Sequence, residues 1–267
     1  MNPNSLELAL NNADDQARLD AIAQAAQTAA PLNEASLDSL IRCLGANRKI
    51  IQRRSAETLA VIAPAHPQIV EAVRSALAHP DSRMRWGSAY TLGLIHDALD
   101  LRAMPALLEA LASSDGDIRW AAAELVVRLG KSDPKAVGNR LLTLSREGNL
   151  NARKMALYCL RDIGGNPEEL LAAAAACCAD NHSLLKMAAL SLISHLNGGE
   201  SAAELALRLL ASDPDDGVRR CAAVALGHIA NRSSLVIEAL RSAANNNDDV
   251  YMMRAANAAL ARLGAKQ

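Results

Sequence analysis

The sequence predicts an all-α protein built as a solenoid of about eight stacked, antiparallel helical hairpins. Three observations support this fold class: a composition rich in Ala and Leu, a motif that recurs every 33 or 34 residues, and helix-starting residues at a fixed place in each copy. Ala and Leu are strong helix formers, and thin side chains let helix axes approach closely. Apolar residues make up 51% of the chain, yet only 2% are aromatic and Phe is absent. We therefore expect a core of small side chains and essentially no strand.

The recurring motif opens with an apolar residue, usually followed by a base, then small residues, then Leu or Ile eight and eleven positions later. Such self-similarity at a fixed period is typical of repeat architectures. Taking each opener as position 0, the openers are Ile51, Met84, Ile118, Ala152, Leu185, Val218 and Met252. The seven copies fill residues 31–267, and residues 1–30 are expected to form a degenerate eighth copy that caps the N-terminal end of a single continuous solenoid.

In most copies of the motif, residues typical of a helix start and of a helix end stand at fixed distances from the opener. Side chains that cap a helix N-terminus stand three residues before the opener, and they are Asp81, Asp115, Asn149, Asp215 and Asp249. Residues that tolerate the left-handed conformation at a helix C-terminus stand twelve after it, and they are Gly130, Gly164, Asn197 and Gly264. The motif is therefore the second helix of a hairpin, about four turns long. Apolar-periodic stretches between the copies, such as 104–112, 168–178 and 204–211, predict the first helices.

The consensus separates the repeat families with similar periods. The Thr-Pro-Leu-His signature of ankyrin repeats and the Trp, Leu-Gly and Tyr pattern of tetratricopeptide repeats are missing. The unit resembles the short HEAT-like repeat of bilin lyases, which reads Asp, apolar, Arg, small, small, Leu-Gly, apolar, and the stretches 81–95, 115–130 and 215–229 match it best. The first and last copies depart from it, with Gln52 and Met253 at the basic position. The resemblance implies a right-handed superhelix whose second helices line the concave surface.

A helical wheel at about 100° per residue shows which side of each second helix is open. Positions 0, 4, 7, 8 and 11 cluster on one side and are expected to pack inward, whereas positions 2, 6 and 9 lie opposite. Position 2 is occupied by Arg53, Trp86, Trp120, Lys154, Met187, Arg220 and Arg254. Position 6 is occupied by Glu57, Tyr90, Glu124, Tyr158, Ser191, Val224 and Ala258. The predicted binding face therefore carries four of the five aromatic residues.

The candidate partner- or ligand-binding residues on this face are Trp86, Tyr90, Trp120, Glu124, Lys154, Tyr158, Arg161, Met187, Arg220 and Arg254. The four aromatic residues among them are expected to form one contiguous patch bordered by Lys154 and Arg161, because neighbouring helices in a stack lie about 8–10 Å apart. An exposed aromatic patch usually marks a contact site. The alternative is that the rings fill space between adjacent helices.

Charge distinguishes the two helix layers although the net charge is only −1, which argues against a protein that coats nucleic acid. The seven second-helix motifs hold 16 basic and 9 acidic residues, and the rest of the chain holds 12 and 20, so an acidic partner segment is drawn to the second helices. The bases at position 1 are expected to pair with capping Asp residues of neighbouring repeats, and they are Arg85, Arg119, Arg153, Lys186 and Arg219.

Location and chemistry follow from what the sequence lacks. Residues 1–15 lack a basic region followed by an apolar core, and no apolar run is long enough to span a membrane, so we expect neither a signal peptide nor a membrane span. The five cysteines have no C-x-x-C spacing, and we expect a cytoplasmic protein with buried thiols. No phosphate loop, nucleophile elbow or H-E-x-x-H motif is present, and His-Glu pairs typical of HEAT-type di-iron hydroxylases are missing. His195 and His228 share position 10 but lack further ligands, so no metal or cofactor is expected.

Three functions fit these features. The leading prediction is a non-catalytic scaffold that holds a protein partner along the concave face, with aromatic anchors and basic residues for acidic groups. The alternative is a bilin-lyase-type subunit that binds a tetrapyrrole and assists its attachment to an acceptor protein, which rests on the resemblance. The third is a HEAT-like DNA glycosylase, for which Glu124 is the nearest carboxylate to the aromatic residues.

Overall fold

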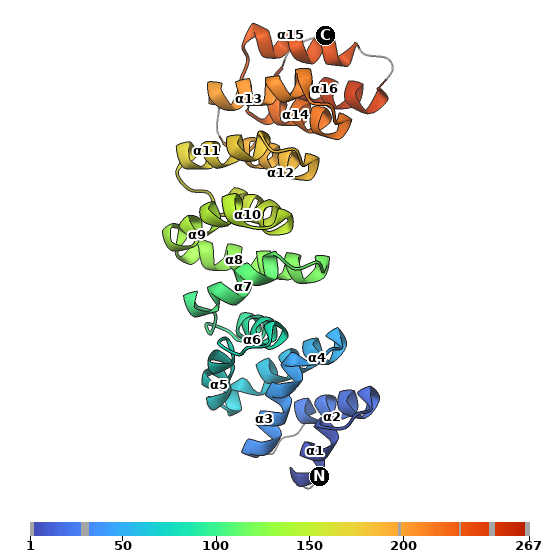
Figure 1. Ribbon diagram of the computed structural model, residues 1–267, viewed down its shortest axis with the longest axis vertical. Helices are drawn as coiled ribbons and strands as arrows, with labels where there is room; N and C mark the ends of the chain where they lie inside the picture. Colours follow the sequence, from blue (N-terminus) through green and yellow to red (C-terminus); the bar gives the residue numbers. More distant parts are fainter. Residues whose placement is uncertain (1–2, 28–31, 197–198, 230, 246–248, 265–267) are drawn as a thin grey trace. The chain divides into compact units, whose positions relative to one another are not determined.

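The computed structural model of the protein describes residues 3–27, 32–196, 199–229, 231–245 and 249–264 (Figure 1). These residues form α-helices joined by short connections and three 3-10 turns, with no strand, so the predicted all-α class is confirmed. The α-helices are α1 (Pro3–Leu10), α2 (Asp15–Gln27), α3 (Glu34–Arg42), α4 (Lys49–Ile62), α5 (Gln68–Ala76), α6 (Ser82–Leu94), α7 (Met104–Leu111), α8 (Gly116–Ser132), α9 (Pro134–Glu147), α10 (Leu150–Ile163), α11 (Pro167–Cys178), α12 (Ser183–Ile193), α13 (Glu200–Ser212), α14 (Asp216–Ile229), α15 (Ser234–Ala244) and α16 (Val250–Arg262).

The helices follow one another along the chain as successive pairs, each a first helix with an odd number and a second helix with an even number. The described part of the chain thus forms a helical solenoid with about eight hairpins, as predicted. The predicted first helices at 104–112, 168–178 and 204–211 correspond to α7, α11 and α13, the last of which begins four residues earlier than expected.

The chain divides into two compact units, Met1–Ala110 with Trp120–Leu129, and Leu111–Arg119 with Gly130–Gln267. In the first unit α2, α4 and α6 pack side by side, and α8 continues the row, because Arg128 donates a 2.6 Å hydrogen bond to the carbonyl oxygen of Gly93 on α6. In the second unit α10, α12, α14 and α16 pack in the same succession, with the first helices on their other side (Figure 1). A single continuous solenoid with a cap at residues 1–30 stays a prediction.

The predicted helix starts are confirmed by hydrogen bonds of the capping side chains. Asp81 Oδ1 accepts from the backbone N–H of Arg83 at 2.9 Å, and Asn149 Oδ1 accepts from that of Ala152 at 2.9 Å. Asp115, Asp215 and Asp249 accept backbone N–H groups in the first turns of α8, α14 and α16. Each bond satisfies an N–H group that has no partner within its helix, which fixes where the helix begins.

The predicted helix ends are partly confirmed. Gly164 follows α10 with φ of +81° and Gly264 follows α16 with φ of +66°, a backbone conformation that favours glycine. Gly130 does not end its helix, because α8 continues to Ser132. A Cβ at Gly130 would overlap the side chain of Ile163 on α10, so this glycine is explained by close helix packing. Asn197 lies outside the described residues.

The bases at position 1 do not pair with the capping residues of neighbouring repeats, which corrects the prediction. Arg85, Arg119 and Arg219 each donate to the carbonyl oxygen six residues earlier, at 2.7–2.8 Å. These carbonyl groups follow the end of the preceding first helix, where they have no partner within that helix. The bond therefore ties the two helices of one hairpin together.

Of the five bases at position 1, Arg85, Arg153 and Lys186 also pair with an acidic residue of the next repeat. Arg85 pairs with Glu109 at 2.7 Å, and Arg153 pairs with Asp180 at 2.8 Å. Lys186 Nζ lies 2.6 Å from Asp213 Oδ2, and the exposed fractions of the two side chains are 13% and 2%. These acidic residues precede the capping position, so the ladder between repeats exists but uses other partners.

Candidate partner-binding face

Large exposed apolar side chains gather on the second helices. Among the described residues, ten such side chains are exposed, and only Leu8 and Leu235 lie on first helices. The other eight are Ile50, Val61, Leu94, Trp120, Leu184, Val224, Val250 and Tyr251. We call the side of the second helices that bears them, in each of the two units, the second-helix face. Within each unit, exposed apolar groups on neighbouring second helices mark a contact surface more often than scattered ones do.

The register of these residues shows positions that the sequence reasoning missed. Ile50, Leu184 and Tyr251 stand one residue before their openers, and Val61 and Leu94 stand at position 10. At about 100° per residue, position −1 lies about 20° and position 10 about 40° from position 6, closer than position 9 at about 60°. The same helical wheel would therefore have identified them, had positions −1 and 10 been assigned to the open side together with positions 2, 6 and 9.

The aromatic residues of the first unit lie on neighbouring helices. The ring centroids of Trp86 and Tyr90 on α6 are 5.5 Å apart, at an angle of 33°. Trp120 occupies on α8 the position that Trp86 occupies on α6, and it is 58% exposed. Trp86 and Tyr90 are half-buried, whereas Trp120 stands largely in solvent. The alternative in which the rings only fill space between helices therefore does not describe Trp120.

A carboxylate stands next to the aromatic residues of the first unit. Glu124 is exposed on α8, one turn after Trp120 and at the same position as Tyr90 on α6. On the other side of α6, Glu57 has this position on α4 and pairs with Arg54 at 3.0 Å. Residues four apart on a helix share one side of it. Trp120 and Glu124 therefore project from the same side of α8.

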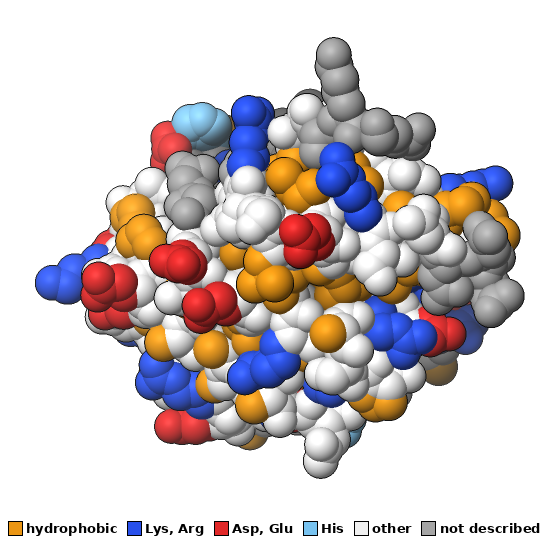
Figure 2. Space-filling view, turned by 90° about the horizontal axis from the view of Figure 1, so that it is seen from above, with side chains coloured by type: hydrophobic (Ala, Val, Ile, Leu, Met, Phe, Trp, Pro, Cys, Tyr) orange, Lys and Arg blue, Asp and Glu red, His pale blue; other side chains and the backbone are white. Residues whose placement is uncertain are grey.

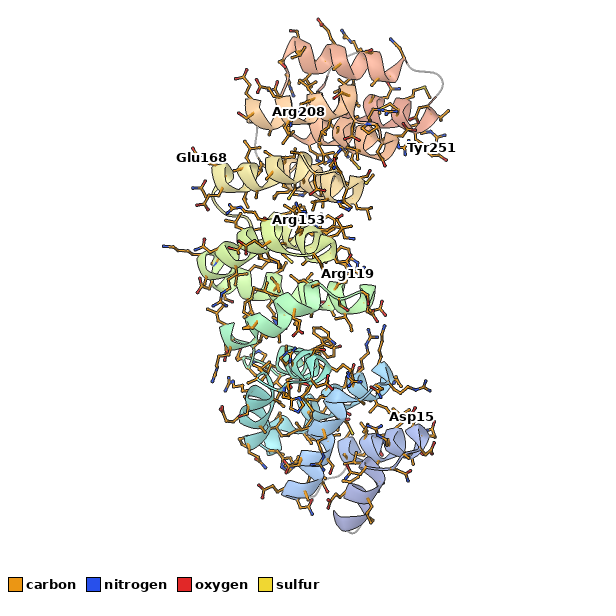
Figure 3. The ribbon with its side chains drawn as sticks, viewed as in Figure 1. Asp15, Arg119, Arg153, Glu168, Arg208 and Tyr251 are labelled. Atoms are coloured by element: carbon orange, nitrogen blue, oxygen red, sulfur yellow. The ribbon has the colours of Figure 1, made fainter. Side chains whose placement is uncertain are left out.

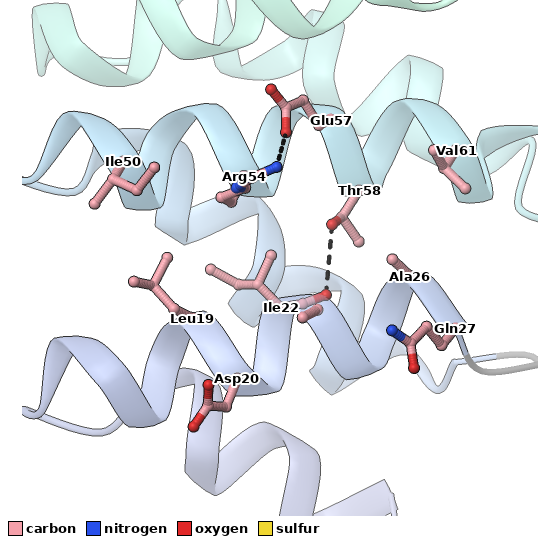
Figure 4. A pocket seen from close by; sticks show the side chains of 11 residues that line it. Leu19, Asp20, Ile22, Ala26, Gln27, Ile50, Arg54, Glu57, Thr58 and Val61 are labelled. Carbon is pink, nitrogen blue, oxygen red and sulfur yellow. Dashed lines mark hydrogen bonds and ion pairs between the residues drawn. The ribbon is translucent and has the colours of Figure 1, made fainter.

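A groove between α2 and α4 adds to the face of the first unit (Figure 4). It encloses about 570 Å³, which is within the range of ligand clefts. Its lining is mostly apolar, with Leu19, Ile22 and Ala26 on α2 opposite Ile50 and Val61 on α4. Thr58 donates a 3.4 Å hydrogen bond to the carbonyl oxygen of Ile22 at its base. The groove shows that the face is hollowed where two second helices meet.

Two tyrosines of the second unit each have a guanidinium over the ring. The Arg161 guanidinium carbon lies 5.4 Å from the centroid of the Tyr158 ring, and its nitrogens pair with Asp162 at 2.7 Å and donate to Ser191 at 2.9 Å. Burial raises the pKa of Tyr158 above its usual range, against the opposing effect of the Arg161 charge. Tyr158 and Arg161 are thus held as a pair on α10.

The second pair joins two repeats. Arg220 on α14 lies 5.8 Å from the centroid of the Tyr251 ring and 3.3 Å from the capping carboxylate of Asp249. Tyr251 is 69% exposed and lies at the start of α16, on the other side of the unit from Glu168 at the start of α11 (Figure 3). Tyr251 was not among the predicted site residues, since it stands at position −1.

The remaining predicted residues of the second unit differ in their surroundings. Met187 packs against α14, because a Cβ at Gly217 would lie 2.5 Å from its Cε atom. Lys154 is half-buried and Arg254 is exposed, and within the described residues neither side chain has a hydrogen bond or an ion pair. These two cations are therefore available to an incoming anionic group. Because Trp86, Tyr90 and Trp120 belong to one unit and Tyr158 to the other, the contiguous patch of four rings stays a prediction.

The described residues include buried thiols and no cluster of metal-ligating side chains. They contain no group of three or more His, Cys, Asp or Glu side chains arranged to hold a metal ion. Burial raises the pKa of the Cys159 and Cys178 thiols to about 12, far from the range of a reactive thiolate. Within the same residues, no helix combines the length and the apolar character needed to cross a membrane. On the surface shown in Figure 2, acidic, basic and apolar side chains are interspersed.

The repeats and the fold have counterparts among known proteins. Residues 37–127 match the family of HEAT repeats. No curated protein matches the chain in sequence at a significant level. Among solved structures, an engineered protein is similar with a TM-score of 0.54 and 18% identity, over 98% of this chain and 79% of that chain.

A karyopherin and importin beta share the fold as well. The karyopherin Kap121p, bound to the extreme C-terminus of the protein phosphatase Cdc14p, gives a TM-score of 0.69 at 13% identity, over 100% of this chain and 35% of that chain. Importin beta gives 0.59 at 14% identity, over 98% of this chain and 41% of that chain. The chain therefore spans well under half the length of these two proteins, and the likeness concerns the fold. Residues 37–127 thus match HEAT repeats in sequence, and the rest of the chain shares the repeat motif and the helical fold of these proteins.

Proposed function

We propose that the protein is a non-catalytic scaffold that binds a protein partner along the second-helix face. The observation that carries this proposal is the gathering of exposed apolar side chains on that face, eight of the ten among the described residues. Burying such side chains against a partner gains about 25 cal/mol for each Å² of apolar surface removed from water. The first helices, by contrast, present mainly polar side chains to solvent.

Acidic groups of the partner are expected to bind the cations of the second unit. Lys154 and Arg254 have no intramolecular partner among the described residues. Arg161 and Arg220 are held over tyrosine rings, and their side chains are 25% and 34% exposed. Preorganised guanidinium groups lose less entropy on binding a carboxylate than mobile ones do. The protein bound to Kap121p in the structure above provides a precedent for partner binding on this fold.

Site-specific photo-crosslinking in the native host tests this proposal. A photoreactive phenylalanine derivative at Leu94, on the second-helix face, should form a crosslink to a defined protein, and Leu184 should capture the same one. The matched control is Leu235, an equally apolar side chain that is 62% exposed on the first helix α15. Equal crosslinking from Leu235 and Leu94, or none from either face position, would contradict the proposal.

A bilin-lyase-type subunit is the second candidate, and the pairing of Tyr158 with Arg161 favours it. A tyrosine ring can stack on a pyrrole, and a guanidinium beside it can pair with a propionate. Mixing the purified protein with a free bilin tests it directly. Binding should change the visible absorption spectrum of the pigment, and the change should be lost in Tyr158→Ala. An unchanged spectrum at a large excess of protein would dismiss this candidate.

A further inference from the structure

The groove between α2 and α4 runs along most of the length of α4. Exposed apolar side chains of this helix mark its two ends, where Ile50 lies opposite Leu19 of α2 and Val61 lies opposite Ala26 (Figure 4). Ile50 and Val61 are 11 residues apart in the chain. At 1.5 Å per residue this spacing corresponds to about 16 Å along the helix axis. The groove therefore has the length of about three turns of an incoming helix.

The lining of the groove favours a helical occupant over an extended one. An extended segment would place backbone N–H and C=O groups against apolar side chains, where unpaired backbone groups cost free energy. The hydroxyl group of Thr58 at the base already donates to the carbonyl oxygen of Ile22, so its hydrogen is not available to an incoming segment. A helix satisfies its own backbone groups and presents apolar side chains spaced three or four residues apart.

The charges of the lining favour a basic occupant. The lining contains one base, Arg54, and two carboxylates, Asp20 and Glu57, so its net charge is −1. Arg54 and Glu57 neutralise each other on the α4 side, where they pair at 3.0 Å. Asp20 stands on the α2 side, where it accepts a 2.8 Å hydrogen bond from Gln16 and has no ion pair among the described residues. Its carboxylate is therefore available to a lysine or arginine of the occupant.

Other bases near the start of α4 do not line the groove. Arg48, which precedes α4, pairs with Asp15 at the start of α2 at 2.8 Å. Lys49 and Arg53 are absent from the lining, and each interacts with another residue of the chain. On a helical wheel they point about 120° and about 80° away from the mean direction of the lining residues of α4. A base of the occupant is therefore expected on the α2 side, at Asp20.

We propose that the groove between α2 and α4 binds an amphipathic helix of the protein partner, whose apolar side chains enter the groove and whose lysine or arginine pairs with Asp20. The inference rests on the proposed function, since it names the chemistry of one partner segment. It assigns a basic segment of the partner to the first unit, whereas acidic groups are expected at the second unit. Each unit thus recognises groups of opposite charge.

Two synthetic helical peptides of about 14 residues test the proposal. Both carry leucine on one side, and the other side carries lysine in the first peptide and glutamate in the second, which is the matched control. Fluorescence anisotropy of the labelled peptides measures their dissociation constants with the full chain. The lysine peptide should bind about twofold to fivefold more tightly than the glutamate peptide. Equal affinities, or no binding of the lysine peptide at about 1 mM protein, would overturn the proposal.

Charge variants locate the basic side chains of the bound peptide. Asp20→Lys should reverse the preference, so that the glutamate peptide binds about twofold to fivefold more tightly than the lysine peptide. Asp38→Lys makes the same change of net charge on the exposed side of the first helix α3, and it should leave the preference unaltered. A preference that survives Asp20→Lys would refute the role of this carboxylate.

Apolar variants locate the leucine side chains. Val61→Ser should weaken binding of the lysine peptide about threefold to tenfold, whereas Leu235→Ser, at an exposed apolar position on the first helix α15, should not change it. An unchanged affinity in Val61→Ser would refute the groove as the site. If neither peptide binds while Leu94 still crosslinks to a partner, the second-helix face binds a protein without a helix in this groove, so the two proposals fail separately.

Discussion

Two glycines inside helices predict opposite effects of the same substitution. A Cβ at Gly87 on α6 would lie 2.5 Å from the carbonyl oxygen and 2.8 Å from the Cβ atom of Leu44. A Cβ at Gly138 on α9 would meet no atom within 4 Å. In both helices alanine is favoured over glycine by about 1 kcal/mol, because glycine loses more backbone freedom on folding. The difference between the two sites is therefore steric.

For Gly87→Ala the steric cost exceeds the gain in helix propensity. Overpacking costs about 1–3 kcal/mol, and the upper end applies here because the opposing atom is a backbone oxygen that cannot rotate away. Subtracting about 1 kcal/mol for propensity leaves a net loss of about 2 kcal/mol. Gly138→Ala should instead gain about 0.5–1 kcal/mol.

Urea unfolding followed by far-ultraviolet circular dichroism measures both effects. The midpoint of Gly87→Ala should fall and that of Gly138→Ala should rise relative to the parent protein, with free energies of unfolding about 3 kcal/mol apart. Leu44 on the 3-10 turn Cys43–Gly45 would have to move away from α6 to relieve the clash. A midpoint for Gly87→Ala at or above that of the parent would refute the close approach of this turn to α6.

Three further perturbations test the packing, the thiols and the caps. Lys186→Met removes the cation that pairs with the carboxylate of Asp213, whose side chain is only 2% exposed. The substitution should lower the free energy of unfolding by about 3–5 kcal/mol. A loss below about 1 kcal/mol in urea unfolding would contradict the buried pair. Iodoacetamide should alkylate the half-exposed Cys221 well before Cys159 and Cys178, whose pKa burial raises to about 12; mass spectrometry showing Cys159 modified first in the folded protein would contradict this. Hydrogen bonds from the Arg83 side chain and backbone lower the pKa of Asp81 to about 2, below its unfolded value of about 3.9, so its stabilising effect is present above about pH 4 and is lost as pH falls through about 2. The thermal midpoint of Asp81→Ala should therefore lie below that of the parent at pH 6 and converge on it towards pH 2, and a constant difference would exclude the carboxylate as the cause.

Structural features that depend only on residues close by in the sequence could be predicted. Asp81 and Asn149 cap their helices because a short side chain accepts a hydrogen bond from a backbone group two or three residues later, which needs no knowledge of the rest of the fold. The spacing of the openers likewise fixed the order of first and second helices. The prediction that Gly130 ends a helix was wrong. A glycine is needed at this position because Ile163, one repeat away, packs against it, and no local sequence pattern indicates that contact.

The face was harder to predict than the fold. Trp120 is exposed as expected, but Met187 at the same position packs against α14, since Gly217 leaves room for its side chain there. Tyr251 was not predicted because only positions 2, 6 and 9 were assigned to the open side, and Tyr251 stands at position −1. The partners of Arg153 and Lys186 could not be chosen from the sequence either, since a long flexible base reaches several acidic residues and carbonyl groups of the next repeat.

Arg220 on α14 contacts the capping carboxylate of Asp249 and the ring of Tyr251 at the start of α16. An additional helical hairpin could be joined to the protein through the same kind of contact. Arg254 has on α16 the place that Arg220 has on α14, and its side chain extends into solvent. A designed hairpin fused after Gly264, with an aspartate at the start of its second helix and a tyrosine two residues later, would offer Arg254 the same carboxylate and ring. The protein could then be lengthened in 33-residue steps, with each added module recognising its predecessor by charge as well as by shape.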